Sequence, residues 1–174
     1  MERFERLGDG RIRVTLHEAE LELLRSIPSE LRVLYDDEGA DPVRGRLFPR
    51  AYLDPTAEDA EREWRELVHP ELVRERLAAL EVLTDSLARA SGAKRDTVTA
   101  DLDADDTAAW LGVLNDARLA LGTRLDVTEA TEYDDLDPDD PATPGLAAYA
   151  WLTYLQGELI ETVMLDLPDE GAAD

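Results

Sequence analysis

The segment that decides the expected fold class lies at residues 103–125 and has the sequence DADDTAAWLGVLNDARLALGTRL. Asp103 has the side chain of a helix N-cap, and Asp105 and Asp106 follow it where acidic groups favour the positive end of a helix. At about 100° per residue, one face of this helix is apolar. Its members are Trp110, Leu111, Leu114, Ala117, Leu121 and Leu125. The segment predicts an amphipathic helix that ends at Gly122 or just beyond.

Further helical patterns lie on both sides of this segment. Apolar spacing predicts helices at residues 16–35, 56–68, 70–92 and 144–165. We expect Thr15 and Glu18 to form a capping box at the start of the first helix, and Pro28 to kink or break it. Pro70 is expected to end one helix and to begin the next.

Two short stretches have the composition of strands. Residues 11–15 alternate polar and apolar side chains, and residues 97–102 can form a second strand that pairs with the first. Residues 36–55 should be irregular, with Leu47, Phe48, Tyr52 and Leu53 holding this segment against the helices. The sequence thus predicts a mainly α fold: a single-domain bundle, residues 1–174, of about five helices with a short two-stranded β ribbon.

Composition excludes several classes of function. The 174 residues carry a net charge of −23, which argues against direct binding to nucleic acid or to an anionic membrane. The sequence contains no cysteine and only two histidines, His17 and His69, so we expect no metal centre and no cofactor. Residues 1–10 do not resemble a signal peptide, and no catalytic motif is present. We expect a cytoplasmic protein that is not an enzyme.

The negative charge is concentrated in the second half of the chain. Residues 1–95 hold 21 acids and 16 bases, whereas residues 96–174 hold 20 acids and only Arg118 and Arg124 as bases, a net of −18. An acidic, proline-bearing loop is expected at residues 131–143, and a disordered tail at 166–174. The loop lacks the glycine and the distal glutamate of a calcium loop, so a solvated linker is the favoured interpretation. Its clustered acids are Asp134, Asp135, Asp137, Asp139 and Asp140.

Three polar side chains fall where apolar ones are expected. Arg118 projects into the apolar face of the helix at 103–125, Asn115 lies at its edge, and Gln156 lies within the apolar face of the last helix. A buried arginine requires a partner. We therefore expect a polar core network of Asn115, Arg118 and Gln156, completed by a carboxylate such as Glu158. A role in helix register is favoured over a ligand site.

The last helix has a second set of large side chains on the opposite side from its main apolar face. Trp151, Tyr154 and Leu165, with Glu158 beside them, form a candidate interaction face. A central core helix is the favoured explanation, and an exposed binding face is the alternative. The same helix is where a homodimer would form.

Three stretches together resemble a known family. They are Arg46-Leu47-Phe48-Pro49 with Ala51-Tyr52 and Asp54; Trp110-Leu111 with Leu114-Asn115-Asp116-Ala117-Arg118-Leu119-Ala120-Leu121-Gly122-Thr123-Arg124-Leu125; and Tyr149 with Trp151-Leu152 and Leu155-Gln156. Their order and spacing are similar to those of the actinobacterial family, initially of unknown function, that includes the AosR-type oxidative-stress regulators. The middle stretch is the most specific of the three.

The resemblance implies a mainly helical cytoplasmic regulator without established catalytic residues. It implies action through protein contacts, with a sigma factor or polymerase component as the partner in transcription and stress response. The thiol switch invoked for AosR-type regulation cannot operate here, because the chain has no cysteine. The alternative is an accessory or adaptor factor in Clp-type regulated proteolysis, which would bind a Clp adaptor or chaperone. A small-ligand-binding protein is a third, less favoured hypothesis.

Overall fold

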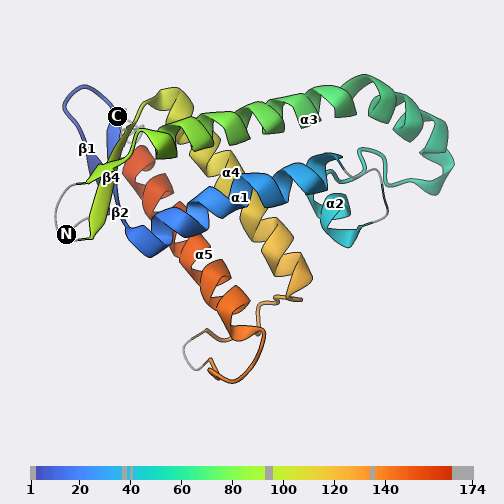
Figure 1. The fold of residues 1–174 in the computed structure, drawn as a ribbon. Helices are drawn as coiled ribbons and strands as arrows, with labels where there is room; N and C mark the ends of the chain where they lie inside the picture. The colour runs from blue at the N-terminus through green and yellow to red at the C-terminus, as the bar shows by residue number, and fades with distance from the viewer. Residues whose placement is uncertain (1–2, 37–38, 40, 93–95, 134–135, 166–174) are drawn as a thin grey trace, which may run out of the picture.

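The computed structural model describes residues 3–36, 39, 41–92, 96–133 and 136–165. Within these ranges it contains five α-helices, one short 3-10 helix and four strands (Figure 1). The helices are α1 (Glu18–Asp36), α2 (Pro42–Leu47), α3 (Glu58–Ala88), α4 (Ala104–Arg124) and α5 (Thr143–Met164), with η1 at Pro55–Ala57. The strands are β1 (Phe4–Arg6), β2 (Ile12–His17), β3 (Ser91–Gly92) and β4 (Thr97–Leu102). The mainly α class is confirmed.

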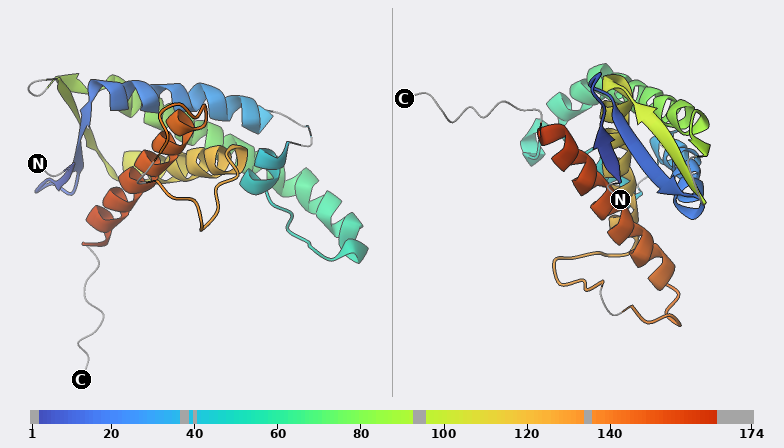
Figure 2. Two further views of the ribbon diagram at one scale, coloured as in Figure 1. Left: turned by 90° about the horizontal axis from the view of Figure 1, so that it is seen from below. Right: turned by 90° about the vertical axis from the view of Figure 1, so that its left-hand side faces the viewer.

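The strands form one antiparallel sheet at one end of the helices, in the order β1-β2-β4-β3 (Figures 1 and 2). The expected pairing of the two longer strands is confirmed: Ile12 lies opposite Leu102, and Arg13 opposite Asp101. The Arg13 guanidinium donates to the Asp101 carboxylate at 2.7 and 2.9 Å across this pair. The expectation of a two-stranded ribbon is wrong, because β1 and β3 add three and two residues to its edges. Strands this short carry no detectable alternation in the sequence.

Strand β2 ends, and helix α1 begins, later in the chain than expected. Thr15 lies in β2, opposite Thr99, so it cannot cap α1, and the predicted Thr15–Glu18 capping box is wrong. The carboxylate of Glu20 instead accepts the backbone N–H of His17 at 2.8 Å, just before the helix. Helix α1 then runs through Pro28 without a break. Buried side chains on both sides of this proline, among them Leu24 and Leu31, hold the helix together.

A single helix replaces the two that Pro70 was expected to separate. Helix α3 has 31 residues with Pro70 inside it, and its first turns extend beyond the rest of the molecule (Figure 1). The carboxylate of Glu61, only 3% exposed, ties these turns to the preceding loop. It accepts the N–H groups of Ala51 and Tyr52, both at 3.0 Å. The number of α-helices in the described residues nevertheless equals the expected five, because the segment expected to be irregular contains α2.

The loop before α3 is only partly held against the helices. Leu47 and Phe48 are buried, as expected. Tyr52 and Leu53 are exposed, and the expectation that they hold the loop in place is wrong. Glu61 fixes the backbone at Tyr52 instead, so apolar burial is not needed there.

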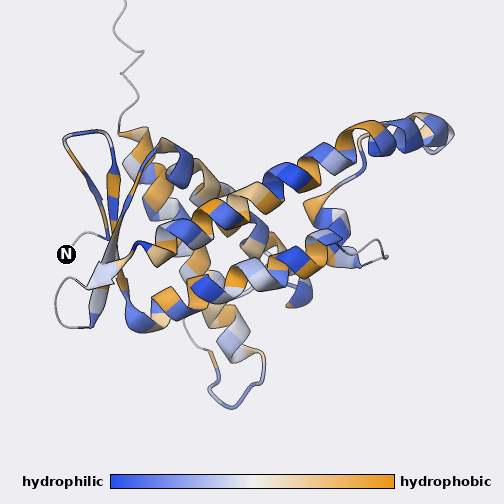
Figure 3. Cartoon of the chain, turned by 45° about the horizontal axis from the view of Figure 1, so that its top comes forward, coloured by the Kyte–Doolittle hydropathy of each residue, from blue (hydrophilic) through white to orange (hydrophobic). Residues whose placement is uncertain are grey.

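Helix α4 is the central helix of the fold. It contacts each of the four other α-helices in the described residues, as well as β4. The side chain of Asp103 accepts the N–H of Asp106 at 2.8 Å, and the Asp106 side chain accepts the N–H of Asp103, which confirms the expected N-cap. Trp110 and Leu114 are fully buried. The long helices show alternating hydrophilic and hydrophobic bands (Figure 3).

One further property follows from the composition of these helices. Among the described residues, none of them combines the length and the apolar character that a bilayer crossing requires.

The fully buried Trp110 provides a test of this packing. Its indole N–H donates to the Ser86 hydroxyl at 2.8 Å, and that hydroxyl donates to the carbonyl of Leu83 at 2.7 Å. The Ser86→Ala variant leaves the indole N–H buried without an acceptor, so we expect the free energy of unfolding to fall by about 1–3 kcal/mol in urea denaturation. Adding Trp110→Phe to that variant removes the orphaned donor. If Ser86→Ala lowers the free energy of unfolding by the same amount in the wild-type protein and in the Trp110→Phe variant, the hydrogen bond does not stabilise the core.

Candidate functional site

The structure joins two of the three residues of the expected polar network. The Arg118 guanidinium of α4 donates to the Gln156 side-chain oxygen of α5 at 2.5 Å and to the Thr153 hydroxyl at 2.9 Å. Gln156 is buried, and its amide donates to the carbonyl of Leu111 at 3.3 Å. Arg118 itself is only half-buried and lies 5.8 Å from the centre of the Tyr149 ring. This network connects α4 to α5.

The other two members of the predicted network lie elsewhere. Asn115 is exposed and lines a shallow depression beside Asp116 and Arg76. Glu158 lies further along α5, in an open depression that also includes Glu5 and Arg6 of β1. The Thr153 hydroxyl takes the place that we expected a carboxylate to fill. Because Arg118 is half-buried, it does not require a full counter-charge.

The second face of α5 divides into an inner and an outer part. Trp151 packs against the core, and its indole N–H donates to Glu20 at 3.0 Å. The same carboxylate accepts from Arg3 at 2.7 Å, and these bonds outweigh desolvation and lower the pKa of Glu20. Tyr154 is 52% exposed and Leu165 81% exposed. Trp151 therefore anchors α5 to α1, and the exposed part of this face lies towards the end of α5.

The acidic loop connects α4 to α5. In its described part, the side chain of Asp137 accepts the N–H of Asp139 at 2.9 Å, and the side chain of Asp140 accepts the N–H of Ala142 at 2.8 Å. These are local turn contacts. Asp134 and Asp135 lie outside the described residues, as does the expected tail at 166–174.

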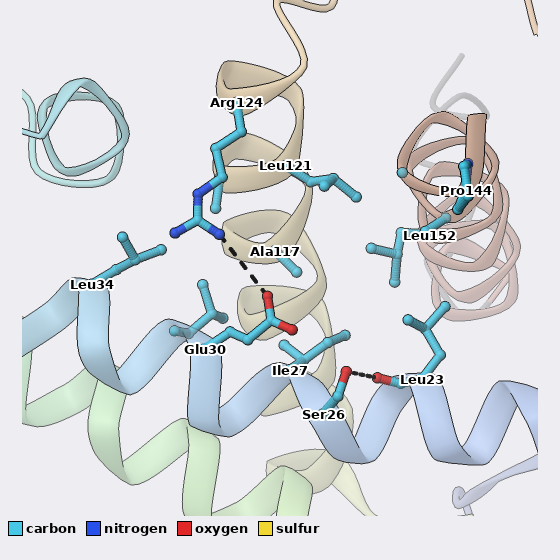
Figure 4. Close-up of a pocket in the computed structure, with 14 residues that line it drawn as sticks. Leu23, Ser26, Ile27, Glu30, Leu34, Ala117, Leu121, Arg124, Pro144 and Leu152 are labelled. Atoms are coloured by element: carbon cyan, nitrogen blue, oxygen red, sulfur yellow. Dashed lines mark hydrogen bonds and ion pairs between the residues drawn. The ribbon is translucent and has the colours of Figure 1, made fainter. Parts of the chain in front are cut away.

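An apolar groove lies between α1, α4 and α5 in the part of the chain that the structure describes. Its cavity measures about 310 Å³. Ile27 and Leu34 of α1, Ala117 and Leu121 of α4, and Leu152 of α5 project towards it (Figure 4). Polar side chains occur only at its edge: Ser26 and Glu30 on α1, and Arg124 on α4. The charged groups of Glu30 and Arg124 are 4.0 Å apart. The groove was not predicted from the sequence.

A buried carboxylate was also missed. Asp116 of α4 is 5% exposed and accepts the hydroxyl of Tyr35 at 2.6 Å. It also forms an ion pair with Arg76 of α3 at 2.5 Å. Burial and the nearby carboxylate raise the pKa of Tyr35, so its hydroxyl remains a donor. The only signal in the sequence was an acid within a helix that is otherwise apolar on more than one side.

Further contacts of Arg76 connect the group formed by Asp116, Tyr35 and Arg76 to the end of α2 and to the middle of α3. Its guanidinium lies 4.6 Å from the centre of the Phe48 ring, and the His69 ring meets the same ring edge-on at 4.8 Å. Nε2 of His69 lies 2.8 Å from a guanidinium nitrogen of Arg44, a contact that neutral histidine makes as the acceptor. Desolvation and the cations of Arg44, Arg65 and Arg76 lower the pKa of His69.

No group of three or more His, Asp or Glu side chains in the described ranges is arranged to hold a metal ion. The polar clusters of the structure connect elements of the fold to one another.

The chain belongs to the DUF2017 family, a domain of unknown function, whose model matches residues 1–163. Among its relatives are the oxidative stress regulators AosR of Mycobacterium tuberculosis (strain ATCC 25618 / H37Rv) and of Mycobacterium bovis, each 30% identical over 135 residues. The putative oxidative stress regulator AosR of Mycobacterium leprae is 31% identical over the same length. The resemblance seen in the sequence is confirmed.

These matches cover 71% of this chain but only 59% of each relative. The chain therefore spans less than two thirds of the length of the relatives. No solved structure matches it.

The buried Asp116 provides a second test. Asp116→Asn keeps an acceptor for the Tyr35 hydroxyl but removes the charge that faces Arg76. Because Arg76 is about one-third exposed, we expect a loss of only about 1–2 kcal/mol in the free energy of unfolding, measured in urea. Glu81→Gln, at an exposed position within α3, is the control and should change it by less than about 0.5 kcal/mol. Equal effects of the two variants would contradict a structural role of the buried pair.

The environment of His69 predicts a pH dependence. Its pKa is lowered in the folded state from the ordinary value of 6.5, so the unfolded chain binds more protons in the window below that value. Stability should therefore fall as the pH decreases through 6.5 towards the lowered pKa. His69→Gln keeps an acceptor for Arg44 and removes this titration. We expect the wild-type and variant unfolding free energies, measured between about pH 5 and 8, to converge towards the acid side. Parallel curves would show that His69 is not the titrating group.

Proposed function

We propose that this chain is a regulatory protein of the oxidative-stress response that acts by binding a protein partner and catalyses no reaction itself. The observation that carries the proposal is its relationship to the mycobacterial proteins named oxidative stress regulator, over 71% of its length. The polar clusters fit this proposal, because they join helices to one another and leave an apolar groove open at the surface.

A sigma factor or another component of the transcription machinery is the partner class that we propose. The surfaces of these proteins that meet DNA are basic. Residues 96–174, with a net charge of −18, would attract such a surface and accelerate its association. Direct thiol-based sensing by these 174 residues is excluded, because they contain no cysteine.

The proposal is tested by capture of partners from host lysate with the tagged chain at about 50 mM and about 500 mM salt, followed by mass spectrometry. We expect a sigma factor or polymerase subunit at low salt and its loss at high salt, because screening shortens the range of the attraction. With the purified partner, the dissociation constant should rise at least about tenfold between the two conditions.

A loop variant serves as the electrostatic control. It changes Asp134, Asp135, Asp137, Asp139 and Asp140 to Asn, which removes five negative charges without shortening the loop. We expect weaker capture of the same partner at low salt. A Clp component retained at high salt would replace the proposal by the proteolysis-adaptor alternative. If neither a transcription component nor a Clp component is captured, the result contradicts the proposal.

A further inference from the structure

We infer that the groove between α1, α4 and α5 is the docking site for one amphipathic helix of a protein partner, and that the polar face of this helix is basic. The inference rests on the proposed function and specifies where and how the partner binds. It is carried by the shape of the groove, by the side chains that line it and by the charge at one of its ends.

The groove has two walls and a floor. Helix α5 packs along α4, whereas α1 and α5 make little direct contact with each other. Between them Ala117 and Leu121 of α4 form the floor (Figure 4), and Ala120 of the same helix also lines the groove. Leu23, Ile27, Leu31 and Leu34 line the α1 side, and Ala148 and Leu152 line the α5 side. The result is an apolar channel that is open to solvent and bordered by three helices.

The dimensions of the groove suit a helix. Its α1 wall extends from Leu23 to Leu34, which at 1.5 Å per residue is about 16 Å, or three helical turns. An amphipathic helix that docks through positions i, i+3 or i+4, and i+7 needs about 10 Å. Alanines at 117, 120 and 148 leave space for the larger anchoring side chains of such a helix. The α1 wall is therefore long enough for two turns of a partner helix.

The charges around the groove indicate which polar face the partner helix has. Arg124 and Pro144, both at the groove, stand directly before and after the segment that connects α4 to α5. The described part of that segment contains Asp126, Glu129, Glu132, Asp137, Asp139 and Asp140 and no basic residue. Glu30 and Arg124, the one acid and the one base that line the groove, lie 4.0 Å apart and offset each other, so the acids of the connecting segment determine the charge at this end. A basic polar face is complementary to this end of the groove, whereas an acidic face would be repelled.

The same argument disfavours a second copy of this chain as the occupant. A protomer with a net charge of −23 would bring further negative charge to an end of the groove that is already acidic. We therefore commit to a basic helix from another protein.

The test uses two synthetic 18-residue helical peptides with the same leucine face, one with lysine and one with glutamate on the polar face. Fluorescence anisotropy with the full chain should show binding of the lysine peptide, weakened by salt, and at least about tenfold weaker binding of the glutamate peptide. Equal affinity for the two peptides, or no binding of the lysine peptide, would overturn the inference.

Two pairs of variants locate the binding. Ala148→Leu fills the groove, and Ala147→Leu places the same side chain at the next, exposed position of α5, outside the groove. Ser26→Arg adds a positive charge at the edge, and Ser29→Arg adds one elsewhere on α1. We expect Ala148→Leu and Ser26→Arg to raise the dissociation constant of the lysine peptide at least about tenfold, and their controls to leave it within about twofold. Because Ser26 is exposed, its substitution tests the site even if Ala148→Leu fails to fold.

The same variants separate this inference from the proposed function. Capture of a sigma factor by wild type and Ala148→Leu alike would overturn the groove as its docking site and leave the regulatory function standing. Binding of the lysine peptide that is lost in Ala148→Leu and Ser26→Arg, without capture of any transcription component, would support the groove and contradict the sigma-factor partner. Light scattering that shows a wild-type dimer and an Ala148→Leu monomer would identify a second copy as the occupant and overturn the inference.

Discussion

A single buried carboxylate connects most of the helices of this protein. Asp116 lies on α4, the helix that contacts all four others in the described part of the chain. One of its oxygens, Oδ2, contacts both Tyr35 near the end of α1 and Arg76 in the middle of α3. Arg76 in turn lies over Phe48, directly after α2. A charge buried in this position must be paired, so α1 and α3 can approach α4 only in the arrangement that brings both partners to it.

The Arg118 network acts on the other side of the same helix. Its bonds from α4 to Gln156 and Thr153 fix the position of α5 along α4. Trp151 then fixes α5 to the beginning of α1 through Glu20. These two connections determine how far α1 and α5 stand apart above α4, and hence the width of the groove. A network that serves helix register thus also shapes the surface at which we propose that a partner binds.

Much of the fold was predictable because it depends on local sequence. The cap at Asp103, the apolar periodicity of α4 and the strand character of β2 and β4 follow from neighbouring residues. The continuity of α1 through Pro28 and of α3 through Pro70 was not predictable, since packing from distant segments outweighs the loss of one backbone hydrogen bond. Of the polar sites, the Arg118–Gln156 pair was found by projection onto one helix face. Asp116 was missed because α4 is buried on more than one side, and the groove was missed because three separate helices create it.

The continuity of α3 has a consequence for how the molecule opens. Proline has no amide hydrogen, so the carbonyl of Glu66 lacks its usual helical donor at position 70. The turns before this point extend beyond the body, and Glu61 ties them to the loop at Ala51 and Tyr52, whereas the turns after it carry the buried Leu80, Leu83 and Leu87 (Figure 1). We therefore expect this one continuous helix to behave as two cooperative units. Amide hydrogens before Pro70 should exchange with solvent through local unfolding, and those in the second half only when the core itself unfolds.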